Sequence, residues 1–306
     1  MNILSLVNAL PGAAAQGLIW GIMAIGVYLT FRILDVADLT VDGTMCTGGA
    51  VCVMMLMSGH NIWVSMLAAT GAGMLAGLAT GIFHTFMGIP AILAGILTQL
   101  GLYSANLKIM GKANQAVNGN KYNLLVSLRN VKGVPFYQNT ILIVAIFIVV
   151  LIAILYWFFG TELGCSLRST GCNPNMSRAQ GINTNVCKVL GLMISNGLVA
   201  LSSALLAQYQ GFADVNMGRG AIVIGLAAVI IGEAIFGHIF RNFALRLLSV
   251  AFGSILYYLV LQTVIWLGID TDLLKMLSAL VVAVFLAVPY WKTKYFTKPT
   301  KRGGNN

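Results

Sequence analysis

Long apolar runs separated by short polar stretches dominate the pattern along this chain. A helix that crosses a membrane needs about 20 mostly apolar residues, and most of these runs are close to that length. The pattern therefore predicts an all-α integral membrane protein with about eight to ten transmembrane helices. The runs cover about residues 17–34, 45–57, 63–87, 89–107, 140–159, 188–210, 220–237, 245–268 and 273–290.

A shorter apolar piece, residues 1–12, precedes the first run and ends at Pro11-Gly12. It is too short to cross a bilayer, so we expect a separate helix at the membrane surface. The piece has neither the basic start nor the small-residue cleavage site of a secretory signal peptide. We therefore expect the first transmembrane helix to remain in the protein.

The composition excludes a soluble domain of ordinary make-up. Of the 306 residues, 58% are hydrophobic and only 8% are charged, whereas soluble domains carry about 25% charged residues. The net charge of +10 is concentrated between and after the apolar runs. That placement favours membrane orientation and contact with anionic lipid over nucleic-acid binding.

Two basic connections, residues 104–138 and 162–188, are separated by one apolar run and must lie on opposite sides of the membrane. Four later runs return the C-terminal tail, residues 292–306, to the side of 162–188, and this tail is basic with no acid. Short basic segments tend to stay in the cytoplasm. We therefore place 162–188 and the tail in the cytoplasm, and 104–138 and the N-terminus outside.

The connection 162–188 contains the pattern of a short helix with defined ends. Asn173 suits a helix N-cap, Pro174 suits the first helical position, and Gly181 suits the left-handed residue that ends a helix. A helix of about two turns is marginal unless it packs against something. We expect it to dock on a partner protein, an ATPase. The alternative is an ordinary surface loop with a helical turn.

Charged residues crowd the end of the first run, where Arg32, Asp35, Asp38 and Asp42 precede more apolar sequence. Charges near the hydrocarbon are costly unless they face a cavity or each other, which favours an interrupted helix inside the bundle. The alternative is a cytoplasmic hairpin with an Arg–Asp pair. In the run 63–87, glycines recur every fourth residue, a spacing that lets a neighbouring helix approach closely.

An internal repeat appears when the sequence is shifted by 176 positions. Asp38-Leu39-Thr40 then falls on Asp214-Val215-Asn216 inside matching apolar surroundings. By the count of apolar runs the two copies enter the membrane from opposite sides, which predicts inverted-topology repeats with interrupted helices, the architecture of many transporters. The two acids either contact cargo or tie broken helix ends together, and we favour the tying role. The repeats cover about residues 17–107 and 188–290.

Glu233 lies within an apolar run of the second repeat. A carboxylate there is neutral or paired, and Arg241 and Arg246 are the nearest basic residues along the chain. We expect a structural ion pair, and a gate or a cargo contact is the alternative. Asp38, Thr40, Asp42, Asp214, Asn216 and Glu233 are thus the candidates for the translocation path or the helix breaks.

Sequence motifs for catalysis are absent. The chain has no phosphate-binding G-x-x-x-x-G-K-[ST] loop, no HExxH, no GxSxG and no Cys/His cluster. We therefore expect no enzyme activity, no metal and no cofactor bound by this chain. Energy for transport has to come from a partner protein or from an ion gradient.

Two motifs resemble those of a known family, the inner-membrane permeases of ABC importers of the branched-chain amino acid and ribose type. The stretch from Arg168 to Asn173, followed by Gly181-Ile182-Asn183, is similar to the family's cytoplasmic coupling segment, R-A-x-G-x-N followed by G-I-N, with Ser169 in the place of alanine. The stretch Asp38–Gly43 is similar to D-L-S-V-G-S of the sugar branch, with Asp42 in the place of glycine. The form FRILDVADLTVDGT looks closest to a Gram-positive branch labelled as tryptophan or tyrosine permeases.

This resemblance implies a single permease domain, residues 1–291, with a coupling segment at 162–188 and a basic cytoplasmic tail at 292–306. It implies a second permease copy, two cytoplasmic ATPase subunits that use ATP, an extracellular binding lipoprotein, and a multi-pass location in the plasma membrane. The residues expected to couple to the ATPase are Arg168, Gly171, Asn173, Arg178, Ala179, Gly181, Ile182 and Asn183.

The cargo implied is a small polar solute, most readily an aromatic or branched-chain amino acid, with a sugar or a nucleoside as the alternative. A secondary transporter that uses an ion gradient without an ATPase is a competing interpretation, and a membrane scaffold without transport activity is a third.

Overall fold

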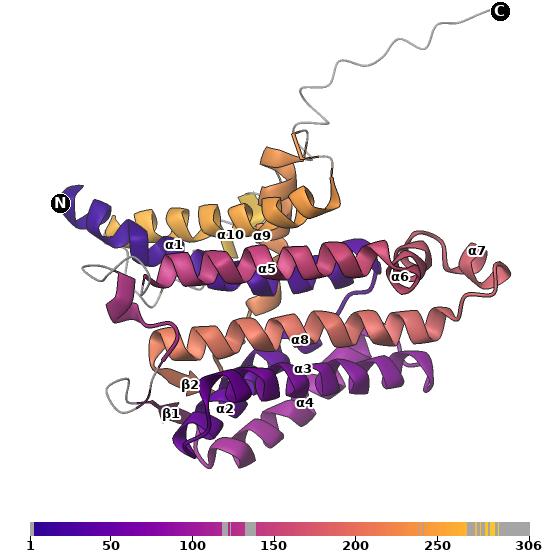
Figure 1. Cartoon of the computed structure of the whole chain (residues 1–306), viewed down its shortest axis with the longest axis horizontal. Helices are drawn as coiled ribbons and strands as arrows, with labels where there is room; N and C mark the ends of the chain where they lie inside the picture. The colour runs from indigo at the N-terminus through magenta and orange to yellow at the C-terminus, as the bar shows by residue number, and fades with distance from the viewer. Residues whose placement is uncertain are drawn as a thin grey trace, which may run out of the picture.

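Figure 1 shows the computed structural model, which describes residues 3–117, 122, 124–131, 139–237, 239–240, 242–267 and positions 273, 276, 279–280, 282–284 and 287. The expected basic tail, 292–306, lies outside the described residues. The elements are α1 (Ile3–Tyr28), the π-helical turn η1 (Leu29–Ile33), α2 (Thr40–Met57), α3 (Ile62–Thr85), α4 (Ala91–Met110), β1 (Asn114–Ala116), the 3-10 turn η2 (Leu128–Val131), α5 (Thr140–Gly160), α6 (Glu162–Cys172), α7 (Pro174–Ala179), α8 (Thr184–Gln210), β2 (Phe212–Asp214), α9 (Ala221–Phe236) and α10 (Phe243–Trp266).

Seven helices in the described part of the chain are long and apolar enough to cross a membrane, namely α1 with η1, α2, α3, α4, α5, α8 and α10. α9 is apolar but shorter, at 16 residues. Large apolar side chains such as Leu67 and Trp157, each 72% exposed, cover the outer surface as lipid contact requires. The all-α membrane class is therefore confirmed, and most of the expected last run, 273–290, lies outside the described residues.

The bundle has two distinct ends. Figure 1 shows the N-terminus, β1 and β2 at one end, and α6 and α7 at the other. We call these the sheet end and the α7 end. α8 runs through the middle of the bundle from the α7 end to the sheet end, with α1 and α5 on one side of it and α2 and α3 on the other.

Helices α3 and α8 pack closely through the repeating glycines of α3. A Cβ atom at Gly77 would overlap the carbonyl oxygen of Leu192, and one at Gly81 would lie 3.1 Å from the Cα of Val189. As residue numbers rise in α3 their neighbours in α8 fall, so the two helices are antiparallel. The predicted close-packing role of these glycines is confirmed.

The first helix departs from the expectation of two separate pieces. α1 continues from Ile3 through Pro11 to Tyr28 without a break. Pro11 removes one backbone N–H donor, but it does not end the helix. The prediction of a separate surface helix over residues 1–12 was therefore wrong.

Two short strands and one helix were not expected. β1 pairs antiparallel with β2 at the sheet end, with Asn114 opposite Asp214. Strands of three residues are too short to show an alternating pattern, and their partners lie about a hundred positions apart. α6 also precedes the short helix at 174–179, within the connection 162–188 for which only that short helix was predicted.

Candidate functional site

The chain breaks between α1 and α2, as the charged stretch predicted. The break begins at η1 and includes Asp35, which has a left-handed φ of 54°. It also includes Asp38, two residues before the start of α2, which is only 3% exposed. The carboxylate of Asp38 accepts a hydrogen bond from the backbone N–H of Thr40 (2.9 Å) and one from Nδ2 of Asn196 (2.7 Å). The interrupted helix, with its acid buried inside the bundle, is confirmed.

Asn196 joins this break to the central helix. It is the thirteenth of the 27 residues of α8, a helix about 40 Å long at 1.5 Å per residue. Its Oδ1 accepts a hydrogen bond from the hydroxyl of Thr44 (2.7 Å), and its Nδ2 also donates to the carbonyl of Leu192 (3.0 Å). α2 therefore starts near the mid-depth of the bundle, beside the centre of α8.

From this start α2 runs toward the sheet end, parallel to α8. Gly48 faces Ala200, and farther along Gln208 donates to the sulfur of Cys52. Residue numbers rise together in the two helices, which fixes the direction of α2. Thr40, the first residue of α2, shares a hydrogen bond of 2.7 Å with Thr80 of α3.

A second interruption lies between α8 and α9, and it meets the first one at Asp42. The carboxylate of Asp42 accepts hydrogen bonds from the backbone N–H groups of Gly220 and Ile222, each at 3.0 Å. These groups lie at the N-terminus of α9, where unpaired N–H donors and the helix dipole favour a negative charge. α9 thus also starts near mid-depth.

α9 runs from there to the α7 end, in the direction opposite to α2. Gly225 packs against Met23 and Val27 of α1, and Glu233, two turns later, forms an ion pair of 3.1 Å with Arg32. The expected ion pair of Glu233 exists, and within the described residues its partner is Arg32 and not Arg246. Arg32 lies 201 positions away and reaches Glu233 because α1 and α9 run side by side; Arg241 lies outside the described residues.

The turns that contain the two repeated acids have the same hydrogen bond. Asp38 accepts from the N–H of Thr40, and Asp214 accepts from the N–H of Asn216 at 2.6 Å. Asp214 is half-buried and also accepts from the side chain of Asn114 of β1. Each acid therefore organises a turn that precedes a helix starting near mid-depth, α2 for Asp38 and α9 for Asp214.

Helices α1 and α8 cross through two matching serine contacts. The hydroxyl of Ser195 donates to the carbonyl of Gly26, and the hydroxyl of Ser202 donates to the carbonyl of Ile19, each at 2.7 Å. Adding 176 to 19 and 26 gives 195 and 202. Under the shift found in the sequence, Ile19 therefore corresponds to Ser195 and Gly26 to Ser202, so the two hydrogen bonds join equivalent pairs of positions.

Two hollows lie beside Arg219, on the segment between β2 and α9. One, of about 390 Å³, is formed by α2, α4 and residues 215–219; the other, of about 410 Å³, includes Trp20, Tyr257 and Tyr258. Arg219 lines both and is exposed. An exposed guanidinium near mid-depth is costly in hydrocarbon, so this face requires water or another protein surface.

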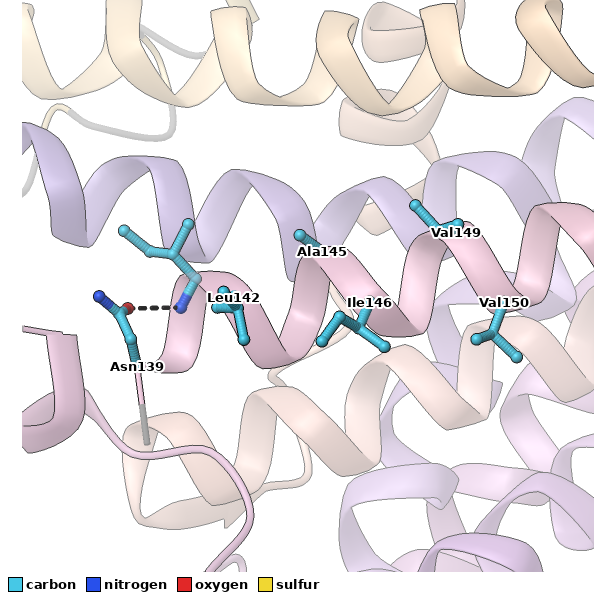
Figure 2. Close-up of a pocket in the computed structure, with 7 residues that line it drawn as sticks. Asn139, Leu142, Ala145, Ile146, Val149 and Val150 are labelled. Carbon is cyan, nitrogen blue, oxygen red and sulfur yellow. Dashed lines mark hydrogen bonds between the residues drawn. The ribbon is translucent and has the colours of Figure 1, made fainter. Parts of the chain in front are cut away.

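A third hollow, of about 460 Å³, follows the outer face of α5 (Figure 2). Asn139 at its end accepts a hydrogen bond from the N–H of Ile141 and caps the helix. The remaining lining side chains are apolar, including Leu142, Ile146 and Val150. This surface suits lipid chains and offers no set of polar groups to a polar solute.

The short helix α7 has the ends that its sequence predicted. The side chain of Asn173 accepts from the N–H of Met176 (3.1 Å), and Pro174 is the first helical residue. Gly181 has a φ of 83°, which suits glycine because a Cβ is unfavourable there. Asn183 then caps α8. α7 lies at the far tip of the bundle (Figure 1), and all its residues except the buried Ser177 are exposed, including Ala179 at its end.

Gly171 connects this tip to the break at mid-depth. A Cβ at Gly171 would overlap the carbonyl oxygen of Ile33 and would lie 3.0 Å from the Cα of Leu34. Ile33 is the last residue of η1. α6 therefore rests directly on the backbone where α1 ends and the segment leading to Asp38 begins.

Other residues of the segment hold it against the bundle. Arg168 donates to the carbonyl of Phe159 (2.7 Å) and lies over the ring of Phe243, with 5.4 Å from Cζ to the ring centroid. Arg178 donates to the hydroxyl of Thr184 (2.8 Å), and Ile182 is half-buried against the core. Both arginines thus have contacts within this chain, although the sequence had suggested contacts with a partner.

Two important residues were missed from the sequence. Asn196 stands in an apolar run, and an amide there is itself a signal because it needs a hydrogen-bond partner across helices. Arg219 is an isolated cation between two apolar runs, which is also a signal of function.

Comparison with known proteins agrees with this geometry. A family model described as the permease component of the branched-chain amino acid transport system matches residues 10–288. The chain is 39% identical to a tyrosine transport system permease protein of Clostridioides difficile, over 89% of this chain and 88% of that protein. It is 27% identical to the fructose import permease protein FruF of Bifidobacterium longum, over 87% of this chain and 73% of that protein.

One solved structure, PsaBC from Streptococcus pneumoniae in complex with Fab, has a similar fold. The TM-score is 0.54 at 16% sequence identity, covering 96% of this chain and 100% of the matched chain. At this identity the likeness concerns the fold alone.

Proposed function

This chain belongs to the family of branched-chain amino acid transport permease components. We propose that it forms the path of an amino acid across the membrane, and that a partner ATPase drives transport by acting on α7. It is a permease component of an ABC-type importer, a multi-pass protein of the plasma membrane, and its family works with ATPase and substrate-binding proteins. The amino-acid cargo is supported by the similarity to a tyrosine permease. The more distant fructose permease is the sugar alternative.

Our proposal for coupling rests on one observation, the contact of Gly171 with the backbone of Ile33. α7 is exposed, α6 directly precedes it in the chain, and Gly171 in α6 touches Ile33, where η1 ends. A push on α7 by an ATPase would be transmitted through this backbone contact to Asp38 and α2. Because the proposed ATPase is cytoplasmic, we place α7 on the cytoplasmic side. Arg168 and Arg178 hold the segment rigid in this proposal.

We also propose that residues 17–107 and 188–290 are inverted repeats of one permease domain. The opposite directions of α2 and α9, the equivalent turns at Asp38 and Asp214, and the reciprocal bonds of Ser195 and Ser202 support this relation. Such repeats move against one another in transporters. The meeting of α2 and α9 at Asp42 is then the place where the two halves join.

Arg219 supports a second permease copy in the complex. Its exposed charge near mid-depth cannot face hydrocarbon without cost. We propose that a second copy encloses this face and leaves a water-filled path between the subunits. Two ATPase subunits and an extracellular binding lipoprotein complete the proposed importer.

The test of coupling uses α7 in the complete complex. Met176 is an apolar side chain on α7 that is 59% exposed. In nanodiscs with the ATPase subunits, we expect Met176→Asp to weaken ATPase binding at least about tenfold, which corresponds to about 1.4 kcal/mol. A charge placed in an apolar contact loses solvation without gaining a partner.

Met87→Asp is the matched control. Met87 is 64% exposed and lies in the turn after α3. This turn is also at the α7 end of the bundle, as the contact between the nearby His84 and Lys188 at the start of α8 shows. Unchanged binding in this variant shows that the effect belongs to α7. Wild-type ATPase binding by the Met176 variant, or solute uptake by the chain alone under an ion gradient, would contradict the proposal.

A further inference from the structure

The hollow between α2, α4 and residues 215–219 has the chemistry of a binding site. Its volume of about 390 Å³ falls within the range of about 300–1,000 Å³ typical of small-molecule sites. Its lining includes one acid, one base, two amides, one phenol and one leucine. These are Asp42, Arg219, Gln99, Asn106, Tyr103 and Leu100.

Asn106 carries an unpartnered polar atom at this site. The residue is fully buried, its Nδ2 donates to the carbonyl of Gly43 (3.5 Å), and its Oδ1 has no hydrogen-bond partner within the described residues. Exchanging the amide atoms would leave an oxygen facing the Gly43 carbonyl, so the free atom is the acceptor. A buried acceptor without a donor destabilises the protein, because it has lost its hydrogen bonds to water. The oxygen has almost no accessible surface in this structure, so an occupant that donates a hydrogen bond would remove this cost after a turn of the Asn106 side chain toward the hollow.

Arg219 supplies a positive charge and hydrogen-bond donors to the same hollow. Within the part of the chain that the structure describes, its guanidinium makes no hydrogen bond or ion pair. The N-termini of α2 and α9, which begin near this level, add positive potential. Guanidinium groups bind carboxylates with two parallel hydrogen bonds. An occupant with a carboxylate therefore matches the Arg219 side of the hollow.

The two sides together define the class of ligand. Asp42 and Asn106 both line the hollow and both offer acceptor oxygens, which suits an ammonium group, while Arg219 suits a carboxylate. Leu100 and Tyr103 border the same space with apolar and aromatic surface. A neutral sugar offers no charged group to Asp42 or to Arg219, so it would gain less from this hollow than a zwitterion.

We infer that this hollow is a cargo site of the permease, and that it binds an α-amino acid as a zwitterion with its side chain toward Leu100 and Tyr103. The inference rests on the proposed function, and it adds that the permease itself selects the charged backbone of the cargo. The ammonium group lies between Asp42 and Asn106, and the carboxylate lies at Arg219.

The test is equilibrium binding of radiolabelled L-tyrosine to the full-length chain, assembled with its ATPase subunits in nanodiscs. We expect saturable binding that is displaced by unlabelled L-tyrosine. Tyramine, which lacks the carboxylate, and 3-(4-hydroxyphenyl)propionate, which lacks the amine, should compete at least about tenfold more weakly, since each loses one charge pairing worth about 1.4 kcal/mol or more. D-Fructose should not compete.

Variants test the assigned contacts. Arg219→Gln and Asn106→Leu should each weaken binding at least about tenfold, while Arg219→Lys should retain part of it because the charge remains. Lys108→Gln is the matched control, since Lys108 is an exposed cation near the end of α4 that does not line the hollow. Thermal unfolding of each variant separates loss of the site from loss of the fold.

Failure of the site and failure of the proposed function give different results. If ATPase subunits assemble but L-tyrosine does not bind, binds equally well to Arg219→Gln, or is displaced by D-fructose, the cargo site is wrong while the permease function stands. If the ATPase subunits do not assemble with the wild-type chain, the proposed coupling is wrong whatever the binding result.

Discussion

The hydrogen bond between Asp38 and Asn196 gives the sharpest test of how the broken helix is held. Both residues are buried, and the bond is 2.7 Å long. Asn196→Asp would place two carboxylates against each other and would lose the donor to Leu192. Asp38→Asn would place two amide donors against each other, although Thr40 could still donate to the remaining oxygen.

The expected costs follow from these contacts. Hydrogen bonds to a charged group are worth about 1.5–3 kcal/mol, so Asp38→Asn should lower the free energy of unfolding by about that amount. Asn196→Asp should lower it by about 3–5 kcal/mol, because it also leaves a buried charge beside another charge. The double variant Asp38→Asn with Asn196→Asp restores a donor facing an acceptor. It loses mainly the Leu192 contact, so its cost should be about 1–2 kcal/mol.

Thermal unfolding in detergent measures this set of variants. At about 2–4 °C per kcal/mol for chains of a few hundred residues, Asn196→Asp should lower Tm by about 6 °C or more. The double variant should recover at least half of that loss. Asn185→Asp, in the first turn of the same helix and outside this network, is the control and should leave Tm nearly unchanged. If the double variant is as unstable as the sum of the two single variants, Asp38 and Asn196 are not coupled and the tying role of Asp38 is refuted.

Three further predictions concern the α7 end of the molecule. Gly171→Ala should cost about 1–3 kcal/mol, because its methyl group overlaps the backbone of Ile33; a thermal melt together with ATP-driven uptake checks it, and unchanged values for both would contradict the contact. Arg32→Gln should cost less than about 1 kcal/mol, because Arg32 is 61% and Glu233 is 32% exposed; the exchange of the two charges should restore stability in a double-mutant cycle, and a cost above about 3 kcal/mol would show that the pair is buried in the assembled complex. Asn173→Ala removes the N-cap of α7 and should cost that helix about 1 kcal/mol; hydrogen exchange at α7 should become faster while the transmembrane helices stay protected, and equal exchange in both proteins would show that the cap is unnecessary.

The sequence predicted the elements whose causes are local. Runs of about 20 apolar residues predicted the membrane-crossing helices, because burial in lipid is decided by each run's own composition. The ends of α7 followed from Asn173, Pro174 and Gly181, because caps act on backbone groups only a few residues away. The glycine spacing of α3 likewise marked its packing face before any neighbour was known.

The sequence alone did not determine the pairing of its polar groups. Every buried charge predicts that some partner exists, since an unpaired charge away from water is costly, but it does not say which one. The tertiary structure alone paired Glu233 with Arg32 over 201 positions, Asp38 with Asn196 over 158, and Asp42 with the first N–H groups of α9. These pairs depend on which helices lie side by side and how deep each one begins. That arrangement is set by close packing across the whole bundle, and no local stretch of sequence contains it.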